Sequence, residues 1–212
     1  NLLVISKGHS DLSYYSLLYY LDILDKKTLY NQNKKILLGG HLDHKVPGVE
    51  LTTGSLGHGL GFAAGIALAE KINKKKYKQF VLMGDAECTE GSIWETALFA
   101  KHHNLNNLVA IIDRNNIGAS DYVDNFSSLN SLKEKWSSFG WNVLTAEGHN
   151  FKDLIRSFHL LKKAKNPTVI IANTTKGKGI RLMQNDPIWH VKKLKNSNEI
   201  YNAKKDIENY EL

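Results

Sequence analysis

The sequence predicts an α/β fold, a doubly wound and mostly parallel sheet with helices on both faces. Short apolar runs alternate with segments of helical periodicity along the chain, and no segment repeats internally. The clearest example is the stretch 79–118, which has the pattern of one strand–helix–strand unit. At 212 residues the chain is long enough for one such domain with its own hydrophobic core.

The stretch 79–118 gathers polar residues where its two strands end. An apolar run at 80–83 precedes Asp85, and a second run at 108–112 precedes Asn115. Ligands of open α/β sheets bind outside the carboxyl ends of the strands, where we expect these two side chains. A carboxylate and an amide oxygen suit Mg²⁺ or Ca²⁺, and a diphosphate could supply further ligands. A capping Asp and a turn Asn in an ordinary βαβ unit explain the same pattern equally well.

The other elements follow from the same periodicity. A run of small residues predicts a tightly packed helix, with Ser55 as its N-cap. Ser92 and Glu95 have the spacing of a capping box for a helix over 92–103. Elsewhere we expect strands at 2–5, 141–145 and 167–172, helices at 12–24, 132–139 and 151–163, a surface loop at 121–131, and a peripheral helix or extension after 192.

Charge and cysteine content exclude several classes of function. The chain carries 28 Lys+Arg against 21 Asp+Glu, a net charge of +7, but its lysine runs lack interleaved aromatic residues. Such runs form solvated faces, so we expect no nucleic-acid partner. One cysteine and no long apolar segment predict a cytoplasmic protein without a membrane partner. The sequence begins at Asn1 without an initiator Met, so we expect residues upstream of it to be missing.

Several other motifs are weak when taken one at a time. His9 lies at a predicted strand-to-helix turn, where an imidazole and helix N–H groups can meet an anion. The pair His41 and His44 lacks the cysteine or third ligand that zinc requires. The glycine-rich segment 59–65 lacks the preceding strand and the spacing of a dinucleotide loop. The basic turn at 176–179 either cradles a phosphate or is an ordinary solvated turn.

In their order along the chain, these motifs resemble a known family. Gly-Asp-Ala at 84–86 followed by Asn-Asn at 115–116 resembles the thiamine-diphosphate signature. Residues 87–95 resemble the amino-terminal half of transketolases, most of all split transketolases, in which that half is a separate polypeptide. The resemblance extends over 3–194. One departure is Ala86, which replaces a signature Gly, so its methyl group crowds the approach of a diphosphate.

The resemblance implies the thiamine-diphosphate-binding fold, with the diphosphate-binding domain at 1–194 and a charged C-terminal extension at 195–212. It implies thiamine diphosphate and Mg²⁺, or Ca²⁺, as cofactors. The metal would be held by Asp85, Asn115 and the carbonyl group of Ile117. Residues that match cofactor-contacting positions of the family are His9, Gly54, Ser55, Leu56, Gly84, Asp85, Ala86, Glu87, Asn115, Ile117, Lys176 and His190.

Four residues match catalytic positions of transketolases. By resemblance, His9, His41 and His190 polarise substrate oxygens or transfer protons at them. Glu90 matches a glutamate that lies at the interface between two active sites. The implied reaction moves a two-carbon ketol unit from a ketose, or a ketose phosphate, to an aldose acceptor.

The resemblance also implies a partner chain. The family glutamate that protonates the aminopyrimidine ring belongs to a pyrimidine-binding domain, which we expect on a C-terminal transketolase subunit. Two such pairs would form a heterotetramer that acts on a sugar phosphate or a nucleotide sugar. Two alternatives remain: another thiamine-diphosphate enzyme, such as a deoxyxylulose-phosphate-synthase-like or dedicated sugar-biosynthesis ketolase, and a catalytically silent binding subunit.

Overall fold

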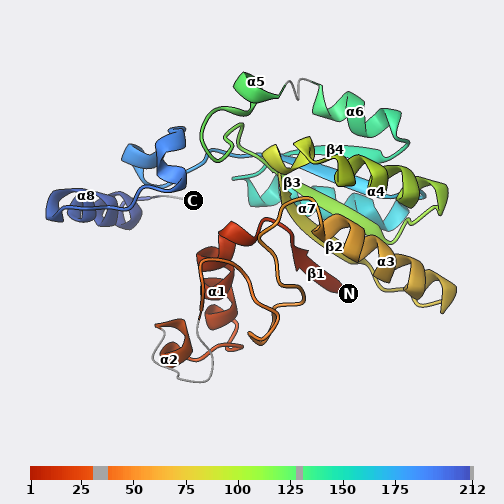
Figure 1. Cartoon of the computed structure of the whole chain (residues 1–212), viewed down its shortest axis with the longest axis horizontal. Coiled ribbons are helices and arrows are strands. Elements are labelled where there is room, and N and C mark those ends of the chain that lie inside the picture. Colours follow the sequence, from red (N-terminus) through yellow and green to blue (C-terminus); the bar gives the residue numbers. More distant parts are fainter. Residues whose placement is uncertain (31–37, 128–130, 211–212) are drawn as a thin grey trace.

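A five-stranded, fully parallel sheet forms the centre of the computed structural model, which describes residues 1–30, 38–127 and 131–210 (Figure 1). The strands follow the order β1-β2-β3-β5-β4 across the sheet, and each neighbouring pair is parallel. The predicted α/β fold is therefore confirmed. The strands are β1 (Leu2–Ile5), β2 (Gln79–Gly84), β3 (Leu108–Arg114), β4 (Asn142–Glu147) and β5 (Thr168–Asn173).

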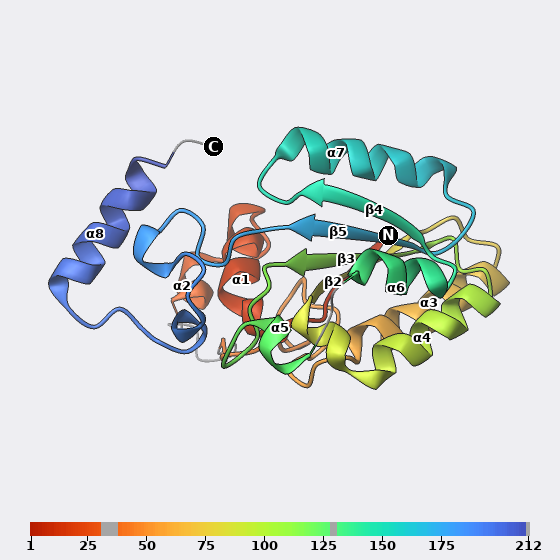
Figure 2. The same ribbon diagram turned by 90° about the horizontal axis from the view of Figure 1, so that it is seen from above.

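Helices cover both faces of this sheet (Figure 2). Buried side chains of α3, α4 and α6 form the larger core with one face, and α7 packs against the other. Helix α1 instead forms a separate apolar cluster with the segment 38–49 beside β1. The helices are α1 (Asp11–Tyr20), α2 (Lys26–Leu29), α3 (Gly59–Ile72), α4 (Gly91–His102), α5 (Val123–Phe126), α6 (Leu132–Ser138), α7 (Phe151–Leu160) and α8 (Ser197–Glu208).

Alternation along β3 explains the two-sided packing. Leu108, Ala110 and Ile112 are fully buried in the core with α3 and α4, whereas Val109 and Ile111 belong to the cluster beneath α7. Successive side chains of a strand point to opposite faces of the sheet. A strand covered on both faces must therefore be apolar at every position, as this central strand is up to its last two residues.

The parallel arrangement brings the carboxyl ends of all five strands to one edge of the sheet (Figure 2). The segments 6–10, 85–91, 113–119 and 174–177 lie at or directly after the ends of β1, β2, β3 and β5. Predicted and observed bounds of the strands differ by at most two residues. All the predicted polar strand ends consequently meet at this one edge.

Two predicted helix caps are wrong. Ser92 and Glu95 form no capping box, because the Ser92 hydroxyl donates to the carbonyl oxygen of Gly57 at 2.9 Å. Ser55 is not an N-cap either, since α3 begins only at Gly59. For Ser92 a contact with a distant segment replaces the local hydrogen bond that the sequence pattern predicts, whereas Ser55 lies four residues before the first residue of the helix.

The short helices α5 and α6 follow β3, and the predicted C-terminal extension follows β5. The predicted loop at 121–131 contains α5, and its residues 128–130 lie outside the described part of the chain. The extension forms α8, which projects away from the sheet (Figures 1 and 2) and is anchored where Arg181 donates to Asp206 at 2.8 Å. Residues 211–212 of the predicted extension lie outside the described part. None of the helices described here is long and apolar enough to cross a membrane.

A cluster of aromatic rings fills the core between α4 and α6. Trp136 is fully buried, and its ring centroid lies 5.2 Å from that of Trp94 and 4.8 Å from that of Trp141. Trp141 in turn donates its indole N–H to the carbonyl oxygen of Ala97 at 3.0 Å. The cluster therefore ties α6 and the start of β4 to α4.

We expect Trp136→Ala to lower the free energy of unfolding by about 3–5 kcal/mol, because it removes a large buried ring and leaves a cavity. Urea denaturation followed by circular dichroism measures this change. Phe151→Ala removes a ring that is 66% exposed. That control should change the free energy by no more than about 0.5 kcal/mol. Equal effects of the two substitutions would contradict the packing described here.

Candidate functional site

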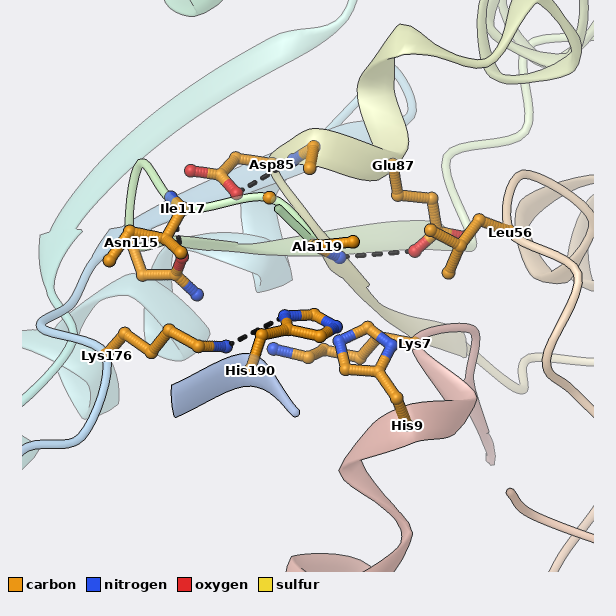
Figure 3. A pocket seen from close by; sticks show the side chains of 13 residues that line it. Lys7, His9, Leu56, Asp85, Glu87, Asn115, Ile117, Ala119, Lys176 and His190 are labelled. Atoms are coloured by element: carbon orange, nitrogen blue, oxygen red, sulfur yellow. Dashed lines mark hydrogen bonds between the residues drawn. The ribbon is translucent and has the colours of Figure 1, made fainter. Parts of the chain in front are cut away.

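One cavity lies at the carboxyl edge of the sheet, between the ends of β1, β2, β3 and β5 (Figure 3). Oxygen-bearing groups lie on one side of it, and cationic and imidazole groups lie on the other. It is lined by Lys7, His9, Leu56, Gly84, Asp85, Ala86, Glu87, Asn115, Ile117, Gly118, Ala119, Lys176 and His190.

Asp85 anchors the oxygen-bearing side. It follows β2, is only 3% exposed, and its carboxylate accepts hydrogen bonds from the backbone N–H groups of Ala86 at 2.8 Å and Asn116 at 2.6 Å. Burial raises the pKa of the Asp85 carboxyl, and these two hydrogen bonds oppose the shift. Among the described residues no cationic group forms an ion pair with Asp85, and a metal ion would restore charge balance at such a buried carboxylate.

Asn115 and Ile117 add two neutral oxygens beside this carboxylate. The side-chain oxygen of Asn115 accepts the N–H of Ile117 at 3.0 Å. No group in the described part of the chain donates to the carbonyl oxygen of Ile117. A carboxylate, an amide oxygen and a backbone carbonyl are the ligand types of Mg²⁺ and Ca²⁺. No described group of three His, Cys, Asp or Glu side chains is placed to hold a metal ion, so His41 and His44 form no such cluster.

Two histidines and a lysine face these oxygens (Figure 3). The rings of His9 and His190 have centroids 5.2 Å apart, and Nζ of Lys176 lies 3.3 Å from Nδ1 of His190. Burial, followed by the charges of Lys7 and His190, lowers the pKa of His9 from 6.5 to about 4. Burial, followed by the charge of Lys176, also lowers the pKa of His190. Both imidazoles are therefore neutral near pH 7 and can accept or donate a proton.

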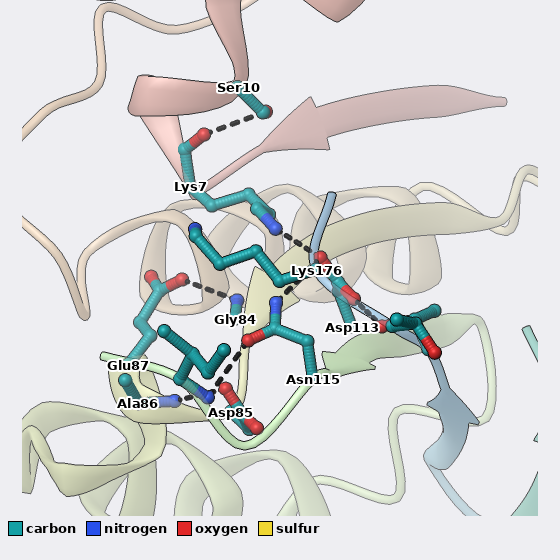
Figure 4. A network of polar contacts seen from close by, with 12 residues as sticks. Lys7, Ser10, Gly84, Asp85, Ala86, Glu87, Asp113, Asn115 and Lys176 are labelled. Carbon is teal, nitrogen blue, oxygen red and sulfur yellow. Dashed lines mark hydrogen bonds and ion pairs between the residues drawn. The ribbon is translucent and has the colours of Figure 1, made fainter. Parts of the chain in front are cut away.

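Lys7 is a site residue that the sequence analysis missed. It lies directly after β1, and its ammonium group forms an ion pair with Asp113 at the end of β3 (Figure 4). Thr174 donates to the other oxygen of the same carboxylate. Burial alone would raise the pKa of Asp113, but Lys7 and the hydrogen bonds outweigh it and hold that pKa below its ordinary value. The rule that located Asp85, a polar residue at a carboxyl strand end, applies equally to Lys7 and Asp113.

Glu87 joins three loops at the base of the cavity. It is 1% exposed and accepts hydrogen bonds from the hydroxyl of Ser6 and from the N–H groups of Gly57 at 2.9 Å and Gly84 at 3.2 Å. The hydroxyl of Ser6 in turn accepts the N–H of Gly59 at 3.1 Å. Although Glu87 lines the cavity, its carboxylate is thus engaged by the protein itself, and its effect is to hold the loops around the site in place.

The loop 54–57 contributes one residue to the cavity wall. Leu56 lines the cavity, whereas Ser55 is exposed and does not line it. Gly57 has a φ of 88°, a left-handed conformation that favours glycine, and a Cβ there would meet Glu90 and Ser92. A Cβ on Gly54 would lie 3.1 Å from the ring of His41. This loop therefore fits closely against its neighbours and leaves little room for side chains.

Ala86 adds a methyl group to the cavity wall without straining the backbone. It is half-buried, lines the cavity and has a negative φ, so the backbone conformation is ordinary for alanine. Its N–H donates to the carboxylate of Asp85, so this N–H already has a hydrogen-bond acceptor within the chain. The added methyl group therefore narrows the site without straining the backbone.

The structure places most of the predicted site residues together. Gly54 and Ser55 lie in the loop behind Leu56, and exposed His41 packs beside Gly54 without lining the cavity. Glu90 is exposed at the start of α4, also outside the cavity. The predicted residues that line the cavity are His9, Leu56, Gly84, Asp85, Ala86, Glu87, Asn115, Ile117, Lys176 and His190.

Comparison with known proteins finds one family and many relatives. The family model for the thiamine diphosphate-binding domain of transketolase matches residues 1–209. An apulose-4-phosphate transketolase subunit from Phocaeicola vulgatus is 41% identical over 189 residues, covering 88% of this chain and 67% of the relative. A 6-deoxy-6-sulfo-D-fructose transketolase subunit from a Clostridium species is 34% identical over 195 residues, covering 91% of this chain and 71% of the relative.

Solved structures agree with this family. The crystal structure of transketolase from Campylobacter jejuni superimposes with a TM-score of 0.87 at 30% identity. The alignment covers 98% of this chain and 34% of the Campylobacter enzyme. The chain thus spans about a third of a complete transketolase and about two thirds of the relatives that are named as subunits.

We expect Glu87→Gln to lower the free energy of unfolding by about 2–3 kcal/mol, because an amide NH₂ then faces one of the buried donors and leaves it unpaired. Urea denaturation measures the loss. Glu90→Gln makes the same chemical change at an exposed position and should cost no more than about 0.5 kcal/mol. A Glu87→Gln variant as stable as its Glu90 counterpart would show that the buried contacts are unimportant.

We expect Lys176→Met to raise the pKa of His190, because it removes the largest charge contribution to that shift. The pKa of His9 should rise less, since burial and Lys7 outweigh Lys176 there. Histidine carbon–proton NMR spectra recorded between pH 3.5 and about 8 follow both rings. Lys178→Met, at an exposed lysine, is the matched control and should leave both pKa values unchanged.

The pKa of His9 also predicts how stability depends on pH, which urea denaturation at several pH values measures. Because the pKa of His9 is lower in the folded chain than its ordinary value of 6.5, the unfolded chain binds more protons between about pH 4 and 6.5. The contribution of His9 to stability is therefore full above pH 6.5 and declines as the pH falls toward 4.

Proposed function

The chain belongs to the transketolase family, as its thiamine diphosphate-binding domain, and we propose that it is the diphosphate-binding subunit of a split transketolase. The observation that carries this proposal is the cavity in which the oxygens of Asp85 and Asn115 face the ammonium group of Lys176. Such a cavity can hold a divalent cation and an anionic group together.

Thiamine diphosphate with Mg²⁺, or Ca²⁺, fits the donor set of this cavity. The carboxylate of Asp85, the amide oxygen of Asn115 and the free carbonyl oxygen of Ile117 would hold the metal. Within the described chain Lys176 has no carboxylate partner within ion-pair distance, so its charge is available to a diphosphate. Leu56 and Ala86 would bound the cofactor on the remaining sides.

The residues of this chain would orient the substrate and move protons. Bound thiamine diphosphate supplies the electron sink that stabilises a carbanion. His9 and His190, neutral near pH 7, can donate a hydrogen bond to a substrate carbonyl oxygen or accept a proton from a hydroxyl. His41, beside Gly54, would meet the substrate from the open side of the site. We assign this set the transfer of a two-carbon ketol unit from a ketose to an aldose acceptor.

The proposal includes a partner chain. The acid that protonates the aminopyrimidine ring would come from a C-terminal transketolase subunit that carries the pyrimidine-binding domain, in a heterotetramer of two pairs. Glu90, which is exposed at the start of α4, would meet such a partner. Two relatives are each named as one subunit of a transketolase. The reducing cytoplasm is the proposed compartment, in keeping with the free thiol of Cys88.

The substrate class we propose is a ketose that carries an anionic group. The two relatives are named for apulose-4-phosphate and for 6-deoxy-6-sulfo-D-fructose, which carry a phosphate and a sulfonate. The partner chain would contribute part of the pocket for that group, so the sugar itself is decided by both subunits. Ala86 favours the alternative of a silent binding subunit, because its methyl group narrows the cavity.

We expect titration calorimetry to show binding of thiamine diphosphate with Mg²⁺ to the complex with the partner chain. Asp85→Ala should abolish it, because the metal loses the one charged group among the three ligands proposed on the described chain. Asp124→Ala, at an exposed aspartate of α5, is the control and should bind normally. Failure of the verified complex to bind would refute the cofactor assignment, and binding without ketol transfer to any aldose would favour the silent subunit.

A further inference from the structure

The Asp113 carboxylate accepts hydrogen bonds from three side chains around the site (Figure 4). One oxygen receives the ammonium group of Lys7 and the side-chain N–H of Asn115, the latter at 3.3 Å. The other oxygen receives the hydroxyl of Thr174. The backbone carbonyl oxygen of Asp113 accepts the N–H of Asp85 at 3.2 Å. Asp113 thereby connects the ends of β1, β2, β3 and β5, while it does not itself line the cavity of Figure 3.

The orientation of the Asn115 amide follows from these contacts. Its oxygen accepts the N–H of Ile117, and its nitrogen donates to Asp113. A flipped amide would place its nitrogen against the Ile117 donor and its oxygen against the carboxylate, which makes both contacts repulsive. The carboxylate can only accept and the backbone N–H can only donate, so the chemistry allows a single orientation.

Lys7 and Thr174 keep the carboxylate itself in place. The side chain of Lys7 is 11% exposed and that of Asp113 is 25% exposed, so the ion pair is largely shielded from water. A partly buried pair braced by further hydrogen bonds is stiffer than one at the surface. The amide of Asn115 is therefore held by a group that is itself held from two other strand ends.

We propose that Asp113 is a positioning residue, whose carboxylate, braced by Lys7 and Thr174, turns the amide oxygen of Asn115 toward the divalent cation. This inference rests on the proposed function, because it takes Asn115 as a metal ligand. Partners of metal ligands act in this way when they fix ligand orientation without touching the metal. Asp113 remains outside the first coordination sphere.

Three variants of the chain, in complex with its partner, separate orientation from charge. Asp113→Leu removes both side-chain acceptors and should weaken Mn²⁺ binding about 10-fold to 100-fold. Asp113→Asn removes the charge but keeps one oxygen that can accept from Asn115, so it should recover most of the affinity, to within about threefold. Asp124→Asn repeats that change at an exposed position of α5 and should bind Mn²⁺ as the unaltered chain does.

Electron paramagnetic resonance of Mn²⁺ with inorganic pyrophosphate as the second ligand measures these affinities without turnover. Unchanged Mn²⁺ affinity in Asp113→Leu overturns the proposal, and so does an Asp113→Asn variant as weak as Asp113→Leu, which would assign the effect to charge alone. Asp85→Ala distinguishes failure of the proposed metal site from failure of the role of Asp113 alone. If Asp85→Ala binds Mn²⁺ normally, the metal site of the proposed function fails, and the role of Asp113 fails with it.

A measurement on the unaltered chain covers the case in which Asp113→Leu does not fold. The side-chain amide protons of Asn115 should exchange with solvent more slowly than those of an exposed asparagine such as Asn202, because one of them is bonded to Asp113. Exchange at the rate of Asn202 overturns the proposal.

Discussion

The buried carboxylate of Glu87 is the constraint on which the site depends. It brings the loop after β1, the loop before α3 and the end of β2 together through Ser6, Gly57 and Gly84. Three donors on one buried carboxylate compensate for its lost hydration. If any of these donors moved away, the buried carboxylate would lose a hydrogen bond that no water replaces. The three loops therefore keep fixed positions relative to one another, and the cavity between them keeps its shape.

Charge is distributed unevenly within that fixed frame. The ion pair of Lys7 with Asp113 is locally neutral, so Lys176 provides the available positive charge and Asp85 the available negative charge. Burial, reinforced by the charges of the nearby lysines, lowers the pKa of His9 and of His190 and keeps both imidazoles neutral near pH 7. A site with one cationic and one anionic wall suits a metal–diphosphate complex, and neutral imidazoles beside it suit proton transfer near pH 7.

The fold and much of the site were predictable because their signals are local. Apolar runs located every strand to within two residues, and polar residues at the ends of those runs located Asp85, Asn115 and Lys176. The cap assignment of Ser92 was wrong because its hydroxyl bonds to Gly57 in a distant segment, and that of Ser55 was wrong because the helix begins four residues later, at Gly59. The rule that polar residues gather at carboxyl strand ends also covers Lys7 and Asp113, which were missed, but only the tertiary structure shows that the two form an ion pair.

The amino-acid order alone thus dictates the parallel sheet, the edge at which the polar residues gather and the resemblance to transketolases, because periodicity and motif order are properties of neighbouring residues. Only the tertiary structure decides which polar groups satisfy each other. Lys7 and Asp113 are separated by 106 positions, and Ser6 and Glu87 by 81. Such pairs form only when the sheet sets β1 beside β2 and β2 beside β3, since strand order and register place the ends of distant segments within hydrogen-bonding distance.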